Sequence, residues 1–214
     1  MPINRSMSIT FEHATQQIIK AGNRLDALHL APATSGNYSV RLDDKAMAIT
    51  VSGAHKGMLE PAQIMKATLD GTPLEDKKPS DETLLHAGIY KIIPESGAIL
   101  HSHSVAGTVL TRLMVGEEFL VLKDYEMLKA YPGVNTHSKT IRLPIFENSQ
   151  DMTELQERVA RVLENAPQLH AYLIRGHGLY GWGKDMREAE RVIEATEFML
   201  QCELQMKQIR STAV

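Results

Sequence analysis

The sequence predicts a domain in which helices and strands mingle in three layers, an α/β or α+β fold. Stretches with apolar residues at helical spacing alternate with short β-prone runs along the chain. Apolar residues make up 43% of the 214 residues and charged residues 23%, the balance of an ordinary globular protein. No internal repeat, low-complexity tract or linker divides the sequence, so we expect one domain over residues 1–214.

The N-terminal part is expected to hold one helix and a pair of strands. Apolar residues recur at helical spacing from about Thr10 to Leu28, which predicts an amphipathic helix. Two β-prone runs follow at residues 38–42 and 46–51, and the Asp-Asp-Lys between them favours a hairpin turn. Small residues flank the hairpin: Thr34-Ser35-Gly36-Asn37 precede it and Ser52-Gly53 follow it.

The remaining two thirds alternate between the two kinds of element. Ser80 and Ser104 are each predicted to cap a helix, and Pro94 closes the first of these helices. Between the two helices, residues 97–103 begin apolar and end polar, which indicates a buried strand. Further strands are expected at 119–122, 141–145 and 171–174, and further helices at 152–163 and from about 185 to 208.

Charge and composition exclude several classes of protein. The net charge of -3 leaves no basic stripe that could neutralise a phosphate backbone, so a nucleic-acid partner is not expected. Residues 1–10 are polar, and no apolar run approaches the roughly 20 residues of a membrane span, so we expect neither a signal peptide nor a membrane segment. A single cysteine, Cys202, fits a small buried side chain in a reducing compartment, the cytoplasm.

Three histidines are the candidates for metal ligands. Alternate side chains on a strand share one face, so the imidazoles of His101 and His103 should project together. A catalytic zinc site commonly has three protein ligands and an open position, and His177, between two glycines after an apolar strand, can supply the third. The alternative is that each is an ordinary surface or core histidine. That interpretation is preferred for the other six: His13, His29, His55, His86, His137 and His170.

The flanking loops of the hairpin are candidates for an anion site. Ser35, Gly36 and Asn37, together with Ser52 and Gly53, can offer backbone N–H groups and side-chain donors to a phosphate. Such residues also occur simply because they form turns, and that alternative stays open. Lys56 would add positive charge to the same anion, or is merely solvated.

Two glutamates are candidates for acid–base chemistry. A carboxylate beside a metal-polarised carbonyl can remove a carbon-bound proton if it comes within hydrogen-bonding distance. Glu82 lies near the start of the helix that precedes the strand with His101, and Glu126 lies in a mixed charged segment. Either residue can instead be an exposed surface glutamate.

Five motifs together resemble the class II aldolase/epimerase family, in its order and at its intervals. They are Thr34-Ser-Gly-Asn37, Thr50-Val-Ser-Gly53, Pro79-Ser-Asp-Glu82, His101-Ser-His103 and Arg175-Gly-His-Gly178. The resemblance covers nearly the whole chain. It implies an α/β/α domain with a mostly antiparallel central sheet, and a divalent metal, zinc by expectation, on the three histidines. It further implies phosphate binding by the first two motifs, Glu82 in or beside the metal sphere, and a homotetramer with active sites near subunit interfaces.

Two further segments separate branches within that family. Lys123-Asp-Tyr-Glu-Met-Leu-Lys129 and Leu143-Pro-Ile-Phe-Glu-Asn148 look like the dehydratases that act on 5-methylthioribulose 1-phosphate in methionine salvage. This resemblance implies Glu126 as the catalytic acid/base. Some of these dehydratases carry cysteine where this chain has Glu82, which leaves the role of Glu82 less defined. The alternatives are an aldolase or a pentulose-phosphate 4-epimerase on the same scaffold, and a metal-binding protein without catalysis.

Overall fold

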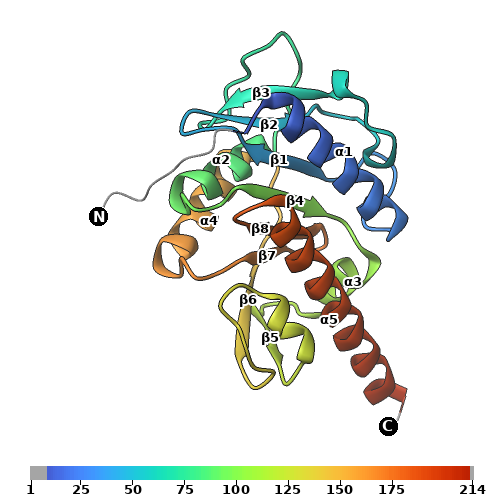
Figure 1. The fold of residues 1–214 in the computed structure, drawn as a ribbon. Coiled ribbons are helices and arrows are strands. Elements are labelled where there is room, and N and C mark those ends of the chain that lie inside the picture. The colour runs from blue at the N-terminus through green and yellow to red at the C-terminus, as the bar shows by residue number, and fades with distance from the viewer. Residues whose placement is uncertain (1–8, 213–214) are drawn as a thin grey trace.

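The computed structural model describes residues 9–212, which form one eight-stranded sheet between two layers of helices (Figure 1). The strand order is β3-β2-β1-β4-β8-β7-β6-β5, and every neighbouring pair is antiparallel except β6 with β7. The predicted three-layer fold with a mostly antiparallel sheet is therefore confirmed. The strands are β1 (Asn37–Arg41), β2 (Ala46–Thr50), β3 (Ile64–Thr68), β4 (Ala98–Ser102), β5 (Phe119–Lys123), β6 (Thr140–Phe146), β7 (Ala171–Ile174) and β8 (Gly178–Gly183).

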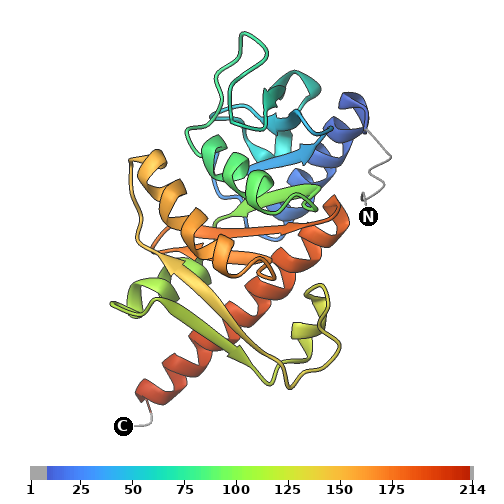
Figure 2. The same cartoon turned by 90° about the vertical axis from the view of Figure 1, so that its left-hand side faces the viewer.

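The helices cover the two faces of the sheet, and each face has its own apolar core. On one face lie α1 (Phe11–Ala27), α3 (Val105–Leu113) and α5 (Met186–Thr212), and on the other α2 (Thr83–Ile92) and α4 (Met152–Asn165). Figure 2 shows α4 and α5 on opposite sides of the strands. Three short 3-10 helices, Lys56–Met58, Pro61–Gln63 and Glu126–Ala130, lie in the connections. None of the described helices is long and apolar enough to cross a membrane.

The local signals in the sequence place most of these elements correctly. Thr10 caps α1 by accepting a hydrogen bond from the N–H of His13, and Ser104 caps α3 by accepting one from Gly107. The helix after Ser80 differs from the prediction. The hydroxyl of Ser80 accepts the N–H of Glu82 within a preceding turn, and α2 itself begins three residues after Ser80, at Thr83.

Two strands escape the sequence patterns. β3 follows directly on a 3-10 helix and, among the described strands, pairs with β2 at one edge of the sheet. β8 reads Gly-Leu-Tyr-Gly-Trp-Gly, a composition that ordinarily argues against a strand. It is nevertheless fully buried between β4 and β7, and α5 packs so closely on it that a side chain at Gly181 would meet Ile193 at 2.8 Å. Close helix packing, rather than turn formation, explains these glycines.

Candidate metal centre

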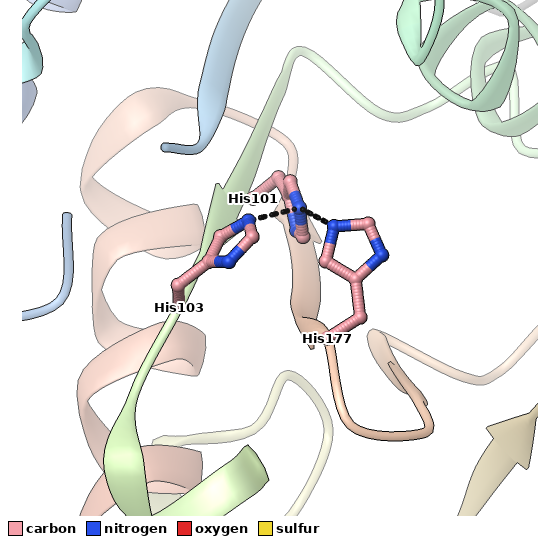
Figure 3. A group of neighbouring side chains, drawn as sticks. All are labelled: His101, His103 and His177. Atoms are coloured by element: carbon pink, nitrogen blue, oxygen red, sulfur yellow. Dashed lines mark hydrogen bonds between the residues drawn. The ribbon is translucent and has the colours of Figure 1, made fainter. Parts of the chain in front are cut away.

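The three candidate histidines converge at the end of β4. Their rings face one another in Figure 3, with 2.9 Å between the Nε2 atoms of His101 and His103 and 3.4 Å between those of His101 and His177. His101 is fully buried, while His103 and His177 are half-buried. His103 lies one residue past the end of β4, and its N–H donates to the carbonyl of Leu30. The rings of His101 and His103 nevertheless project to the same side, as predicted for alternate residues of a strand.

Local backbone features bring His177 to the other two histidines. It lies in the turn between β7 and β8, and its N–H donates to the carbonyl of Ile174. At Gly178, a Cβ atom would stand 2.2 Å from the carbonyl oxygen of Ser102 and 2.8 Å from the ring of His101. Only glycine therefore allows β8 to approach β4 this closely beside the histidines. Arg175 fixes the turn further, donating to the carbonyls of Thr111, Met114 and Glu117 and to the carboxylate of Glu147.

The proton positions fit a metal ligand set. Nδ1 of His101 lies 3.1 Å from the carbonyl oxygen of Leu179, and Nδ1 of His177 lies 3.3 Å from Oδ1 of Asn148. Since both partners only accept, each ring carries its proton on Nδ1 and turns the Nε2 lone pair toward the group. Burial lowers the pKa of His101 to about 4 and that of His103 to about 3, which keeps both neutral as metal binding requires.

The spacing of the nitrogen atoms points the same way. A tetrahedral zinc with Zn–N bonds of about 2.0–2.1 Å sets neighbouring ligand nitrogens roughly 3.3 Å apart. All the ligand atoms of the three histidines lie within 4.8 Å of one another. Three lone pairs crowded together repel unless a cation lies among them, so the group could hold a divalent metal ion.

Glu82 completes the group as a carboxylate. Its Oε1 lies 3.1 Å from Nε2 of His177 and 3.5 Å from Nε2 of His101, and it has no hydrogen-bond partner within the described residues although it is buried. Its Oε2 accepts a 2.6 Å hydrogen bond from the side-chain amide of Asn37. Burial raises the pKa of the Glu82 carboxyl group, whereas the hydrogen bond from the Asn37 amide lowers it. The orphaned Oε1 faces the place where a cation or a polar substrate atom would lie.

The two small-residue loops meet beside this group. Gly36 has φ +80°, and a Cβ there would lie 2.5 Å from the carbonyl oxygen of His101, so the first loop presses against β4. Lys56 ties the loops together, because its ammonium donates to the carbonyls of Thr34 and Ala54. It is 1% exposed, so the expectation of a merely solvated lysine is wrong. Burial lowers the pKa of Lys56 to about 8, and Glu82 opposes that shift.

The five predicted phosphate ligands are not equally available to an anion. Ser52 and Gly53 are exposed, and Oγ of Ser35 is buried without a hydrogen-bond partner in the described part of the chain. The Asn37 side chain, in contrast, is engaged by two partners, Glu82 and His86. Donors for an anion therefore remain at Ser35 and in the second loop, whereas the amide of Asn37 is already used.

A cavity of about 520 Å³ opens on the histidines from the side of α3. His103 and His177 line it, and its apolar wall consists of Pro32, Val105 and Val109. Val105 is 78% exposed, and Leu113, two turns further along the same helix, is 60% exposed. An apolar stripe on the surface of α3 thus borders the entrance to the metal centre.

Comparison with known proteins agrees with this geometry. The family described as Class II Aldolase and Adducin N-terminal domain matches residues 16–204. The chain belongs to the class II aldolase family. Curated relatives include the methylthioribulose-1-phosphate dehydratase of Pseudomonas fluorescens (strain Pf0-1), 48% identical over 95% of this chain and 98% of that protein. Another is the methylthioribulose-1-phosphate dehydratase of Pseudomonas aeruginosa (strain LESB58), 52% identical over 90% of this chain and 94% of that protein.

Solved structures agree on the class II aldolase fold. L-fuculose-1-phosphate aldolase from Thermus thermophilus superposes with a TM-score of 0.73, covering 92% of this chain and 95% of that one, at 24% identity. This likeness carries the fold alone. The prediction that the sequence resembles the dehydratases rather than the aldolases of the family is confirmed by the names of the close relatives.

Glu126, the other predicted acid/base, does not contact the three histidines of its own chain. It begins the 3-10 helix Glu126–Ala130, is exposed, and forms an ion pair with Lys129, which lowers the pKa of its carboxyl group. None of the contacts found for the three histidines among residues 9–212 involves it. The cavity beside the histidines is not lined by it either. A single chain therefore does not bring Glu126 to the metal centre.

Several residues near the three histidines were not predicted from the sequence. Asn148 orients His177 and Glu147 holds Arg175, roles that the resemblance of their segment to one branch of the family does not reveal. His86 is among the histidines expected to be ordinary. Its position four residues after Glu82, in the helix that the sequence predicts from Ser80, is a signal that could have linked the two.

A buried carboxyl group supports the histidines from behind. Glu197 of α5 is 2% exposed, and its Oε1 accepts a 3.1 Å hydrogen bond from Ser102, the residue between His101 and His103. Burial raises the pKa of Glu197 to about 7, against opposing hydrogen bonds from Ser104 and Ser102. This carboxyl group couples α5 to the strand that carries two of the histidines.

Proposed function

We propose that this chain is a metal-dependent hydro-lyase that removes water from 5-methylthioribulose 1-phosphate to give 5-methylthio-2,3-dioxopentyl phosphate in methionine salvage. The close relatives that carry the name methylthioribulose-1-phosphate dehydratase support the substrate. The observation that carries the reaction type is the convergence of His101, His103 and His177, with the orphaned Oε1 of Glu82 beside them. We further propose that the enzyme works as one domain in the cytoplasm, in keeping with its single free cysteine.

The histidines would hold one divalent metal, which we propose to be zinc. A metal held by these histidines would supply Lewis-acid chemistry at the C2 carbonyl, which would make the C3 proton of the substrate acidic. The carbonyl of Leu179 and the side chain of Asn148 hold the rings of His101 and His177 with Nε2 turned toward the group.

Two carboxylates divide the proton transfers in this proposal. Glu126 removes the C3 proton, and the C4 hydroxyl then leaves as water after protonation. Tautomerisation of the resulting enol gives the diketone, so no carbon–carbon bond breaks. Glu82, fixed beside the histidines, orients the substrate hydroxyl groups and serves as a second acid/base.

Glu126 must then come from a second copy of the chain, because one chain leaves it exposed and away from the histidines. The exposed apolar stripe of Val105, Val109 and Leu113 on α3 borders the cavity and supports burial of this surface between subunits. We propose a homotetramer in which each metal centre is completed by Glu126 of a neighbouring subunit.

The phosphate end of the substrate is assigned to the two loops. Ser35 and Gly36 of the first loop and Ser52 and Gly53 of the second offer hydroxyl and backbone donors. Lys56 bridges these loops with a buried positive charge, which favours an anion there. Of the five predicted phosphate ligands, we retain Asn37 only through its backbone.

A product assay tests the reaction. Purified protein incubated with 5-methylthioribulose 1-phosphate should release the diketone, and a chelator should abolish the release until zinc is restored. Fuculose 1-phosphate serves as the matched substrate for the alternative. Formation of dihydroxyacetone phosphate without diketone would establish an aldolase instead.

Mixing two inactive variants tests the shared site. Glu126→Gln should lose turnover and keep its metal, whereas His101→Ala should lose both. Tetramers reassembled from equal amounts of the two should recover about a quarter of the wild-type activity if each site needs one intact contribution from each of two neighbours. Absence of any recovery in tetramers shown to be mixed refutes a shared site.

A further inference from the structure

A chain of buried polar groups leads from the core to Glu82. Tyr90 OH lies 2.9 Å from Oγ of Ser39, which lies 2.7 Å from Nδ1 of His86. Nε2 of His86 lies 2.5 Å from Oδ1 of Asn37, whose Nδ2 donates to Oε2 of Glu82 over 2.6 Å. Tyr90, Ser39, His86 and Asn37 are all at most 2% exposed. Solvent therefore cannot replace any link.

The direction of every hydrogen bond in this row of groups follows from the orientation of the Asn37 amide. Its Nδ2 donates to Oε2 of Glu82, so its Oδ1, which faces Nε2 of His86, must accept. His86 then donates from Nε2. Both of its ring nitrogens face neutral groups inside the core, so the ring is neutral and Nδ1 accepts from Ser39. The oxygen of Ser39 in turn accepts from Tyr90.

We propose that His86, in its Nε2–H tautomer, is a positioning residue that locks the Asn37 amide and thereby fixes the Glu82 carboxylate in the metal centre. The inference rests on the proposed function in so far as Glu82 takes part in turnover. Without a donor at Nε2 of His86, Oδ1 of Asn37 would be buried and unsatisfied, and the amide could rotate by 180°. Rotation would turn an acceptor toward the carboxylate and release it from its place.

The same geometry determines whether protons can move along this row of hydrogen bonds. Asn37 stands between His86 and Glu82, and an amide accepts one hydrogen bond and donates another without transferring a proton. The chain therefore holds Glu82 but does not supply it with protons from the core. Of the two carboxylate oxygens, Oε2 is held by Asn37, and Oε1 faces the histidines on the side where the substrate would bind.

Nitrogen-15 NMR of imidazole-labelled protein tests the tautomer without reference to activity. The signals of His86 are assigned by their loss in His86→Gln. We expect one protonated nitrogen, Nε2, and one bare nitrogen, Nδ1. A proton on Nδ1, or on both nitrogens, would overturn the proposal even if the protein proves to be a dehydratase.

Substitution tests the mechanical role. His86→Leu removes the donor at similar volume and should lower kcat about 10- to 100-fold while KM and metal content stay near wild type. His86→Gln places an amide N–H near the position of Nε2 and should restore most of kcat. Ile89→Val, a buried change on the same helix outside the chain of polar groups, controls for general core damage.

A double-mutant cycle assigns the effect to Glu82. In a Glu82→Gln background, His86→Leu should cause little further loss, because the group that it positions has already been changed. Full additivity of the two losses would overturn the proposal. The visible spectrum of the cobalt(II)-loaded protein gives a readout independent of turnover. The spectrum should change in His86→Leu and return to that of the wild type in His86→Gln. An unchanged spectrum in His86→Leu would count against a positioning role.

Discussion

The buried carboxyl group of Glu197 should impose a measurable pH dependence on folding. In the unfolded chain this group releases its proton near the ordinary value of 4.5, whereas burial holds the proton in the folded protein up to a pKa of about 7. Between these values the folded state binds one proton more than the unfolded state. The free energy of unfolding therefore falls as the pH rises through this window, and the loss is complete above about pH 7.

The size of the effect follows from the same two values. A shift of one pKa unit corresponds to about 1.4 kcal/mol, so Glu197 should cost roughly 3 kcal/mol of stability at pH 8 relative to pH 5. Glu197→Gln keeps an acceptor for the hydroxyl of Ser102 and removes the titration. The variant and the wild type should have similar stability at pH 5, and the variant should be more stable at pH 8.

Urea unfolding of the metal-free proteins at a fixed protein concentration, measured at pH 5 and pH 8, gives the required difference. Only the difference between variant and wild type is interpreted, because other groups titrate equally in both. If the variant gains the same free energy at both pH values, the carboxyl group does not titrate in this window and the reasoning fails. Glu190→Gln, a less buried carboxyl group on the same helix, should show a smaller pH dependence.

Three further predictions concern the metal, the first loop and the second loop. His103→Ala should lose most of its bound metal by elemental analysis, whereas His13→Ala, a change at an exposed position, should keep it; full metal occupancy in His103→Ala would contradict the ligand assignment. Gly36→Ala and Gly116→Ala both force alanine to φ +80°, which costs about 1–2 kcal/mol. Only at Gly36 would the added Cβ meet a carbonyl oxygen, at 2.5 Å, so Gly36→Ala should lose more free energy of unfolding in urea. Equal losses in the two variants would refute the close approach. Lys56 carries its charge below its pKa of about 8, so KM for the substrate should rise as the pH passes that value. In Lys56→Met, KM should be higher than in the wild type at every pH and should lack the increase near pH 8. Parallel pH profiles of KM in the two proteins would exclude an electrostatic role.

Much of the fold could be predicted because local signals and tertiary structure agree. The apolar spacing of α1, the cap at Ser104 and the β-prone runs of β1 and β2 each act within a few residues, and each element formed where expected. β8 could not be predicted, because its glycines are required by the close packing of α5. That packing is a contact between segments that the local sequence pattern does not reveal. The first turn of α2 failed for a related reason: Glu82 is held by Asn37 and the histidines, so the helix starts after it.

The candidate site divides along the same line. The pair His101 and His103 follows from the two-residue period of a strand, and His177 from motif order, so all three could be found in the sequence. The use of Asn37 could not, because it depends on His86, which lies 49 residues further along the chain. In our proposal Glu126 reaches the metal centre of a neighbouring subunit, and local sequence patterns do not reveal how subunits would assemble.

The strand order has a thermodynamic consequence for the metal. β1 to β3 form one meander and β5 to β8 the other half of the sheet, and β4 joins them by pairing with β1 on one side and β8 on the other. His101 and His103 lie on or just after β4, and His177 lies directly before β8, so the three side chains straddle the junction between the halves. A bound metal thus acts as a removable cross-link that makes the two halves unfold together. Hydrogen exchange should show its largest gain in protection on metal loading at the β4–β8 pairing, with smaller gains at the edge strands β3 and β5.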